Sequence, residues 1–226
     1  NLEKNYFGLQ FHPEVTHTDF GLKIIENFIN VCGVKRNWNA DDILKNISTQ
    51  AKAEVGEGKV LLALSGGVDS TVLASVLHKT LEDRLVCVMV DHGLLRKDEA
   101  NNVVTNLKEK IGLEVNLVNA QETFLEKLKG IKDPEEKRKI IGNTFIEVFE
   151  AEAKKNQGIE WLAQGTIYPD VIESAGNSKS KAKVIKSHHN VGGLPEKMNL
   201  KLLEPFRMLF KDEVRKIGKA INLPDE

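Results

Sequence analysis

The stretch LLALSGGVDSTVLASVL, from Leu61 to Leu77, places a polar loop with two glycines between two apolar segments. The first apolar segment is typical of a buried β-strand. The second predicts a helix whose apolar residues pack on a sheet. Gly66 and Gly67 permit a sharp turn and leave backbone N–H groups accessible, because no Cβ blocks a close approach. The sequence therefore predicts a strand–loop–helix unit with bare amides at the start of the helix.

This loop has the chemistry of a phosphate site. Amides, hydroxyls and the positive end of a helix dipole all favour phosphate or pyrophosphate. Asp69 would repel such an anion unless a cation lay between them, which suggests a bridging Mg²⁺. The sequence contains neither a Walker A loop nor the dinucleotide pattern G-x-G-x-x-G. A tight structural turn is the alternative explanation, but the flanking Ser65 and Ser70 and the position after a buried strand favour the phosphate site.

Strand and helix signals alternate along the rest of the chain. Buried strands are predicted at 59–64, 85–90, 114–118 and 160–164, with helical stretches between them. This order predicts an α/β fold: a parallel, twisted sheet with right-handed crossovers and helices on both faces. Before the sheet, the sequence predicts a strand at 5–11, then a helix with the apolar face Leu22, Ile25, Phe28 and Ile29, then a helix at 41–55.

One helix has unusually clear start signals. Asp133 provides a capping carboxylate, Pro134 takes the first helical position, and Glu136 follows three residues after the cap. An apolar face then predicts a core contact, and its members are Ile141, Phe145, Val148 and Phe149. Lys137, Arg138 and Lys139 lie near the helix start, where the dipole does not favour cations. Solvated charges explain them, and an anion site explains them equally.

Composition limits the classes of function. The chain has 226 residues, enough for one full core, and a net charge of −1, which excludes the broad basic field of a duplex nucleic-acid binder. No apolar run approaches the roughly 18 residues of a membrane span, and the first residues lack a signal-peptide pattern, so we expect a cytoplasmic protein. Cys32 and Cys87 both lie in apolar surroundings and are predicted to be core residues rather than a disulfide or zinc ligands.

A basic segment lies between Glu173 and Glu196, where the sequence has no acidic residue. Its cations and histidines are Lys179, Lys181, Lys183, Lys186, His188 and His189. A solvated loop is the ordinary interpretation, and a loop that binds phosphate is the alternative. A metal site is disfavoured because adjacent histidines rarely converge on one ion.

The motif LSGGVDSTV resembles the pyrophosphate-binding loop of the N-type ATP pyrophosphatases, enzymes of the adenine nucleotide alpha hydrolase-like fold that cleave ATP between the α and β phosphates. That loop alone leaves several families open, including NAD synthetases, argininosuccinate synthetases and tRNA-modifying enzymes. Five further motifs, spread over essentially the whole chain, resemble the GMP synthetase family: DHGLLRKDEA, DPEEKRKIIGNTFIEVF, LAQGTIYPDVIES, KVIKSHHNVGGLP and LLEPFRMLFKDEVRKIG.

The resemblance implies a ligase that aminates XMP to GMP through an adenyl-XMP intermediate, with release of AMP and pyrophosphate. It places the ATP phosphates and Mg²⁺ at Ser65, Gly66, Gly67, Val68, Asp69 and Ser70, with Asp69 as the metal ligand. Gln164 and Gly165 are expected to border the nucleotide, since ligands bind at the carboxyl ends of parallel strands.

Further site residues follow from the same resemblance. Arg138 is implied to contact the XMP phosphate, with Ser187 and Asn190 also binding substrate. The implied catalytic residues are Asp170, Glu173, Lys186, His188 and His189. From spacing alone, Asp170 and Glu173 are equally explained as residues that stabilise the start of a helix after Pro169.

The first residues resemble a different domain. FGLQFHPEV is similar to the end of a class I glutamine amidotransferase domain, in which a His and a Glu complete a triad with a cysteine nucleophile. Here these are His12 and Glu14, and because no cysteine has the required G-x-C-x-G context, we expect the pair to be inert. We therefore expect 1–33 to be a remnant of that domain and 34–226 to be the ATP pyrophosphatase domain.

The resemblance also implies partners. The expected ones are ATP, XMP and ammonia or glutamine, with no nucleic acid and no membrane. We expect the family's dimerisation domain, which would make a homodimer, to be absent from residues 1–226. Two alternatives stay open: another N-type ATP pyrophosphatase, tRNA-modifying or NAD synthetase-like, and a non-catalytic module that binds adenine nucleotide.

Overall fold

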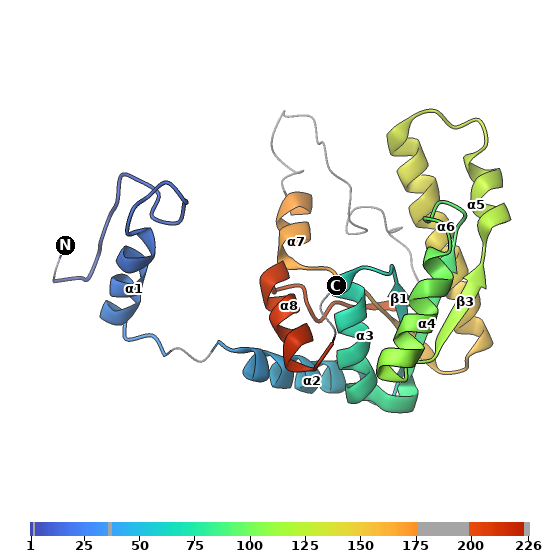
Figure 1. The fold of residues 1–226 in the computed structure, drawn as a ribbon, viewed down its shortest axis with the longest axis horizontal. Coiled ribbons are helices and arrows are strands. Elements are labelled where there is room, and N and C mark those ends of the chain that lie inside the picture. The colour runs from blue at the N-terminus through green and yellow to red at the C-terminus, as the bar shows by residue number, and fades with distance from the viewer. Residues whose placement is uncertain (2, 36–37, 176–198, 224–226) are drawn as a thin grey trace. The chain divides into compact units, whose positions relative to one another are not determined.

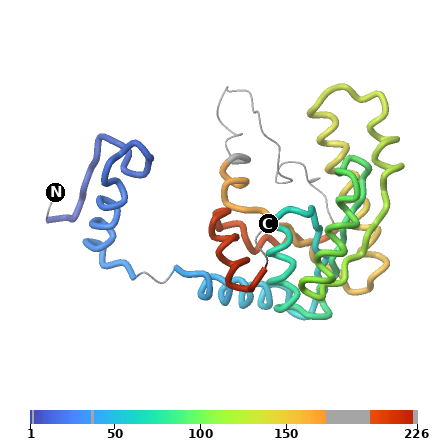
Figure 2. Tube along the Cα trace, viewed as in Figure 1, coloured from blue at the N-terminus to red at the C-terminus, as the bar shows by residue number. Residues whose placement is uncertain are grey.

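A computed structural model describes residues 1, 3–35, 38–175 and 199–223. The chain forms two compact units, Asn1–Trp38 and Asn39–Glu226. Unit 1 is the dark-blue N-terminal part of the trace in Figure 2, and the light-blue helix Ala40–Val55 belongs to unit 2.

Unit 2 is built on a sheet of five parallel strands, β1 (Lys59–Leu64), β2 (Leu85–Asp91), β3 (Val115–Asn119), β4 (Ile159–Ala163) and β5 (Lys201–Leu203). The strand order is β3-β2-β1-β4-β5. Figure 1 labels β1 and β3 within this unit. β1 lies in the middle, and Leu62 pairs with Cys87 on one side and with Ala163 on the other. This central position explains why the sequence of β1 is a continuous apolar run.

Helices cover both faces of the sheet. The first face packs against α2 (Ala40–Val55), α3 (Val68–Leu81), α4 (Glu99–Ile111) and α8 (Lys211–Ala220), through a core that contains Leu62 and Met89. The second packs against α5 (Gln121–Leu128) and α6 (Pro134–Lys155), through a core that contains Leu61 and Leu162. Two short helices, η1 (Glu82–Arg84) and α7 (Tyr168–Ala175), complete the described unit. The predicted fold class is confirmed.

The best-marked helix also forms as predicted. The Asp133 carboxylate accepts a hydrogen bond from the backbone N–H of Glu136 at 2.8 Å, and Pro134 begins α6. Phe149 is buried, and Phe145 packs partly buried against the same core. The predicted capping residue, the proline at the first helical position and the apolar face of this helix are therefore all present in the structure.

The N-terminal unit corrects three predictions. No strand forms at residues 5–11, and although α1 (Gly21–Val31) forms, Leu22 on its predicted core face is 84% exposed. Cys32, predicted to be buried, is exposed, whereas Cys87 is buried as predicted. A unit of about 38 residues has too little apolar surface to enclose a full core, so its apolar side chains make only partial contacts, such as the edge-to-face contact of Phe7 with Phe28. In the described part of the chain, no helix has the length and apolar character to cross a bilayer.

The two cysteines provide a test of this packing. Burial raises the pKa of the Cys87 thiol to about 12, so almost none of it is thiolate at pH 8. We expect a disulfide reagent at pH 8 to modify Cys32 in the folded chain and to reach Cys87 only after unfolding in guanidinium. A Cys32→Ser chain should then show no fast reaction. Equal labelling rates for both thiols in the folded chain would contradict the burial of Cys87.

Candidate functional site

A cavity lies where the strand order reverses. From β1 the chain proceeds outward to β2 and β3, then returns to place β4 and β5 on the other side of β1. In open parallel sheets, ligands bind at the carboxyl ends of the strands at such a switch point. The cavity there has a volume of about 510 Å³. Its lining includes these predicted site residues: Ser65, Gly67, Asp69, Ser70, Gln164, Gly165 and Asp170.

The loop between β1 and α3 is held by its own serines. Gly66 adopts φ +78°, a conformation that disfavours a side chain. The Ser65 backbone N–H donates to Ser70 Oγ at 3.3 Å, and Ser70 Oγ donates to the Gly67 carbonyl at 3.0 Å. Gly67 precedes α3 and provides no side-chain cap. The first N–H groups of α3 are thus left to a ligand, because a helix start has no internal partners for them.

The end of β4 approaches this loop closely. A Cβ on Gly165 would lie 3.3 Å from the backbone nitrogen of Ser70, so a larger residue there would press on the first turn of α3. A Cβ on Gly66 would lie 2.9 Å from Val103 Cγ2 on α4. Glycine is therefore favoured at position 66 by its positive φ as well as by the contact with Val103, and at position 165 by the close approach to Ser70 alone.

Three helices begin at the cavity. Asp69 lies in the first turn of α3, Asp170 in that of α7, and Lys211 is the first residue of α8; all three line the cavity. Each helix start carries a partial positive charge of roughly half a unit. The combined field favours a polyanion in this cavity.

Asp69 is the residue that fits a metal ion. Its Oδ1 is buried and has no hydrogen-bond partner, and its Oδ2 lies 3.7 Å from Lys211 Nζ. A buried carboxylate oxygen without a partner is costly unless a ligand satisfies it. Within residues 1, 3–35, 38–175 and 199–223, no cluster of three or more His, Cys, Asp or Glu side chains is placed to hold a metal. A Mg²⁺ ion at Asp69 fits because Mg²⁺ commonly takes one or two carboxylates together with substrate phosphates and water.

Asp170 has a structural contact as well as a place in the cavity. Its Oδ2 accepts a hydrogen bond from the backbone N–H of Ile167 at 3.0 Å, at the start of α7, and the residue is buried. The helix-start explanation allowed by its spacing therefore describes a real contact. Glu173 also lies in α7.

Sequence reasoning missed His92, which lines the cavity just after β2. Its Nδ1 accepts a hydrogen bond from the Leu94 backbone N–H at 3.2 Å, and its ring lies against Phe145 at 5.4 Å between centroids. Burial lowers the pKa of His92, which outweighs the opposite influence of the nearby carboxylates. The lowered pKa favours the neutral ring, and the bond accepted by Nδ1 places the proton of that neutral form on Nε2. The sequence did mark His92 as a candidate, because it lies at the carboxyl end of a predicted strand, as Gln164 does.

Other predicted site residues lie elsewhere. Arg138 does not line the cavity; it pairs with Glu135 at 3.1 Å and lies seven residues before Phe145, about 10 Å along the same face of α6. Gly66 and Val68 line a second cavity of about 230 Å³, together with residues of α4 and α8. Lys186, Ser187, His188, His189 and Asn190 fall outside the described residues.

Unit 1 contains a histidine–carboxylate pair. His12 Nδ1 lies 2.8 Å from Glu14 Oε1, and both side chains are exposed. A hydrogen bond from the Glu14 backbone N–H to its own carboxylate, and the bond with His12, lower the pKa of Glu14. A carboxylate bonded to a histidine nitrogen is the arrangement that orients the base of a nucleophilic triad.

Two family models match the chain. A model described as "PP-loop domain" matches residues 39–190. A model described as "Glutamine amidotransferase class-I" matches residues 1–32.

Curated relatives match over the whole chain. "GMP synthase [glutamine-hydrolyzing]" from Aquifex aeolicus (strain VF5) is 60% identical over 100% of this chain and 44% of the relative. The protein of the same name from Hydrogenovibrio crunogenus is 55% identical, again over 100% of this chain, and 43% of its length is covered. The chain thus spans less than half the length of the curated relatives it matches.

Solved structures show the fold. An NH3-dependent NAD synthetase from Campylobacter jejuni matches with a TM-score of 0.61 and 14% identity, over 82% of this chain and 75% of that one. The U34-tRNA thiolase NcsA from Methanococcus maripaludis matches with a TM-score of 0.51 and 18% identity, over 82% of this chain and 66% of that one. At these identities, the likeness shows a common architecture and nothing finer.

Proposed function

The chain belongs to the PP-loop domain family, and from this membership we propose that it is the ATP-cleaving part of a GMP synthase. The observation that carries the proposal is the partnerless, buried Oδ1 of Asp69 beside a serine-closed loop at the start of α3. This arrangement suits a pyrophosphate group with its Mg²⁺. The relatives at 55–60% identity, all of them named GMP synthase, support XMP as the acceptor.

The chemistry proposed for the cavity is adenylyl transfer. The C2 oxygen of XMP attacks the α phosphorus of ATP, the bond between the α phosphorus and the bridging oxygen breaks, and pyrophosphate leaves with the electron pair. Ammonia then adds at C2, AMP departs, and loss of a proton gives GMP. When bound, Mg²⁺ supplies charge neutralisation on the phosphates.

The chain's own groups position these reactants. The amides and hydroxyls from Ser65 to Ser70 bind the departing pyrophosphate, and the Asp69 carboxylate would hold a Mg²⁺ ion that neutralises its charge. Gln164 and Gly165 border the nucleotide at the end of β4. Catalysis of this kind depends mainly on fixed geometry and preorganised charge.

The finer assignments belong to the same proposal. Arg138 binds the XMP phosphate, and its place on the Phe145 face of α6 is compatible with a substrate that extends from the cavity. The implied roles of Asp170, Glu173 and of the residues from Lys186 to Asn190 stay predictions.

The amidotransferase match to residues 1–32 supports glutamine as the source of ammonia. The net charge of −1 supports the absence of a nucleic-acid partner. The domain boundary at 33/34, the inert state of His12 and Glu14, the homodimer and the cytoplasmic location stay predictions.

The identity of the acceptor provides the test. A protein that extends this chain to the full length of its relatives is incubated with Mg-ATP and an ammonium salt, and with XMP, nicotinic acid adenine dinucleotide or tRNA in separate reactions. We expect AMP and pyrophosphate in equal amounts with GMP, and only when XMP is present. Release with one of the other acceptors would assign a different PP-loop activity. Formation of ADP and phosphate would contradict cleavage between the α and β phosphates.

A further inference from the structure

Lys211 occupies a position that fold stability does not explain. It is the first residue of α8, where the helix dipole disfavours a cation. It also lies three and seven residues before Val214 and Gly218, both buried, and so shares the face of α8 that packs on the core.

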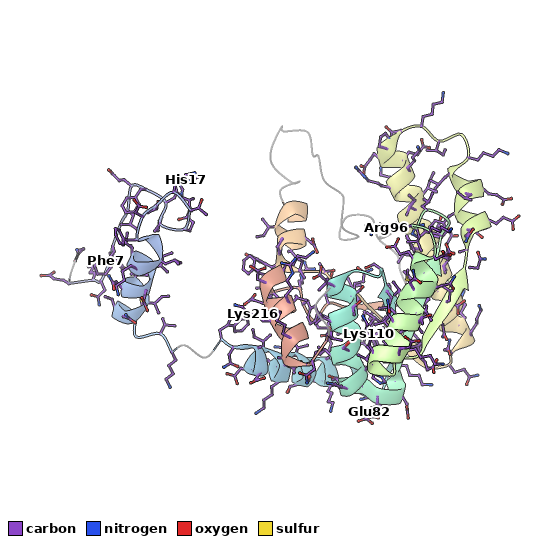
Figure 3. The ribbon with its side chains drawn as sticks, viewed as in Figure 1. Phe7, His17, Glu82, Arg96, Lys110 and Lys216 are labelled. Carbon is purple, nitrogen blue, oxygen red and sulfur yellow. The ribbon has the colours of Figure 1, made fainter. Side chains whose placement is uncertain are left out.

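Among the described residues, Asp69 is the only oppositely charged residue within ion-pair distance of Lys211. Lys211 Nζ lies 3.7 Å from Asp69 Oδ2, and its side chain is 51% exposed. An ion pair at this distance and exposure contributes little to stability. The other cations of α8 differ, because Arg215 pairs with Asp212 on its own helix and Lys216, labelled in Figure 3, does not line the cavity.

The cavity gives the ammonium group a second use. Lys211 lines the same cavity as Ser65, Gly67 and Ser70 of the phosphate loop. An ammonium has three donors, and the contact with Asp69 uses at most one of them. A Mg²⁺ ion bound to Asp69 would neutralise the carboxylate that Lys211 now contacts. The lysine could then donate to the phosphates instead.

We propose that Lys211 is a phosphate-binding residue of this cavity. It pairs with Asp69 before the nucleotide arrives, and it donates to an oxygen of the β or γ phosphate once Mg²⁺ is held by Asp69. The inference rests on the proposed function, because it takes ATP to be the ligand of this cavity. It adds a residue from α8, about 140 positions after the loop, to the group that holds the departing pyrophosphate.

The test compares ligands with and without the β and γ phosphates. Calorimetric titration of the purified chain measures the affinity for ATP, inorganic pyrophosphate and AMP, each with saturating Mg²⁺. We expect Lys211→Met to weaken ATP and pyrophosphate about tenfold, the loss of one charge-assisted hydrogen bond, and to leave AMP unchanged. Lys211→Arg should restore most of the affinity, and Lys216→Met is the matched control on the same helix.

The outcomes separate the two proposals. Wild-type affinity for pyrophosphate in Lys211→Met would overturn the assignment of Lys211 and leave ATP binding intact. An equal loss for AMP, or the same loss in Lys216→Met, would show a structural effect and would also overturn it. A wild-type chain that binds neither Mg-ATP nor Mg-pyrophosphate would overturn the proposed function itself.

Discussion

Asp69→Asn is expected to lower XMP-dependent pyrophosphate release on the order of 10²-fold, as is typical when one preorganised partner of a developing charge is lost. Asparagine keeps the size of the side chain but removes the charge that holds Mg²⁺ against the phosphates. The buried Oδ1, which has no partner in the protein, is the atom whose role is tested. The measurement is single-turnover release by a protein of the relatives' full length.

The metal dependence distinguishes this effect from a general loss. With EDTA, Asp69→Asn should bind ATP at least as tightly as the wild type, because a carboxylate that repels the phosphates is gone. With saturating Mg²⁺, the same variant should bind ATP more weakly than the wild type. Asp212→Asn is the matched control, since Asp212 is a first-turn carboxylate of α8 that does not line the cavity. If Mg²⁺ strengthens ATP binding equally in both variants, Asp69 is not the metal ligand.

Phe206→Ala is expected to lower the free energy of unfolding of unit 2 by about 3–5 kcal/mol. The Phe206 side chain is 0% exposed in the core between the sheet and α8, so alanine would leave a large void. Phe206 also anchors the turn after β5, in which its carbonyl accepts the Leu209 N–H at 2.8 Å. The Leu209 carbonyl in turn accepts the Tyr168 N–H, at the start of α7.

Trp161 makes the loss measurable. It is buried in β4, and in a Trp38→Phe background it is the only tryptophan, so its fluorescence follows guanidinium unfolding of unit 2. Met208→Ala is the control because Met208 is exposed in the same turn, and its effect should stay within about 0.5 kcal/mol. An equal midpoint shift for both variants would show that the turn, and not the buried ring, sets the stability.

The sequence predicted the part of the fold that has strong local signals. The strands at 59–64 and 85–90 are long, apolar and bounded by polar residues, and both form within one residue of the expected limits. β5 was missed because three residues, Lys201–Leu203, are too few for a pattern. The opposite error, a strand expected at 5–11, arose because an apolar pattern does not show whether a pairing strand is available.

The residues of the candidate site also differ in whether a local sequence pattern marks them. Ser65, Gly67, Asp69, Ser70 and Gln164, which line the cavity, were predicted because a local motif or the end of a predicted strand marks them, and their roles stay predictions. Lys211 was missed because its contact with Asp69 joins segments far apart in the chain, and no local pattern reports such a contact. His92 could have been predicted, because it follows the end of β2. The rule that ligands bind at the ends of parallel strands was used for Gln164 but not for His92.

The position of β1 between β2 and β4 has a consequence for the order of assembly during synthesis. The half of the sheet formed by β1, β2 and β3 needs only short-range crossovers, whereas Leu61 pairs with Leu162, about a hundred residues later. Contacts of such separation carry a high chain-entropy cost and form late. As the chain leaves the ribosome, the phosphate loop can therefore fold onto its strand well before Gly165 arrives to close over it. If ATP binds this cavity as proposed, it would bind only after the last crossover is complete, and it would favour the finished sheet over the open precursor.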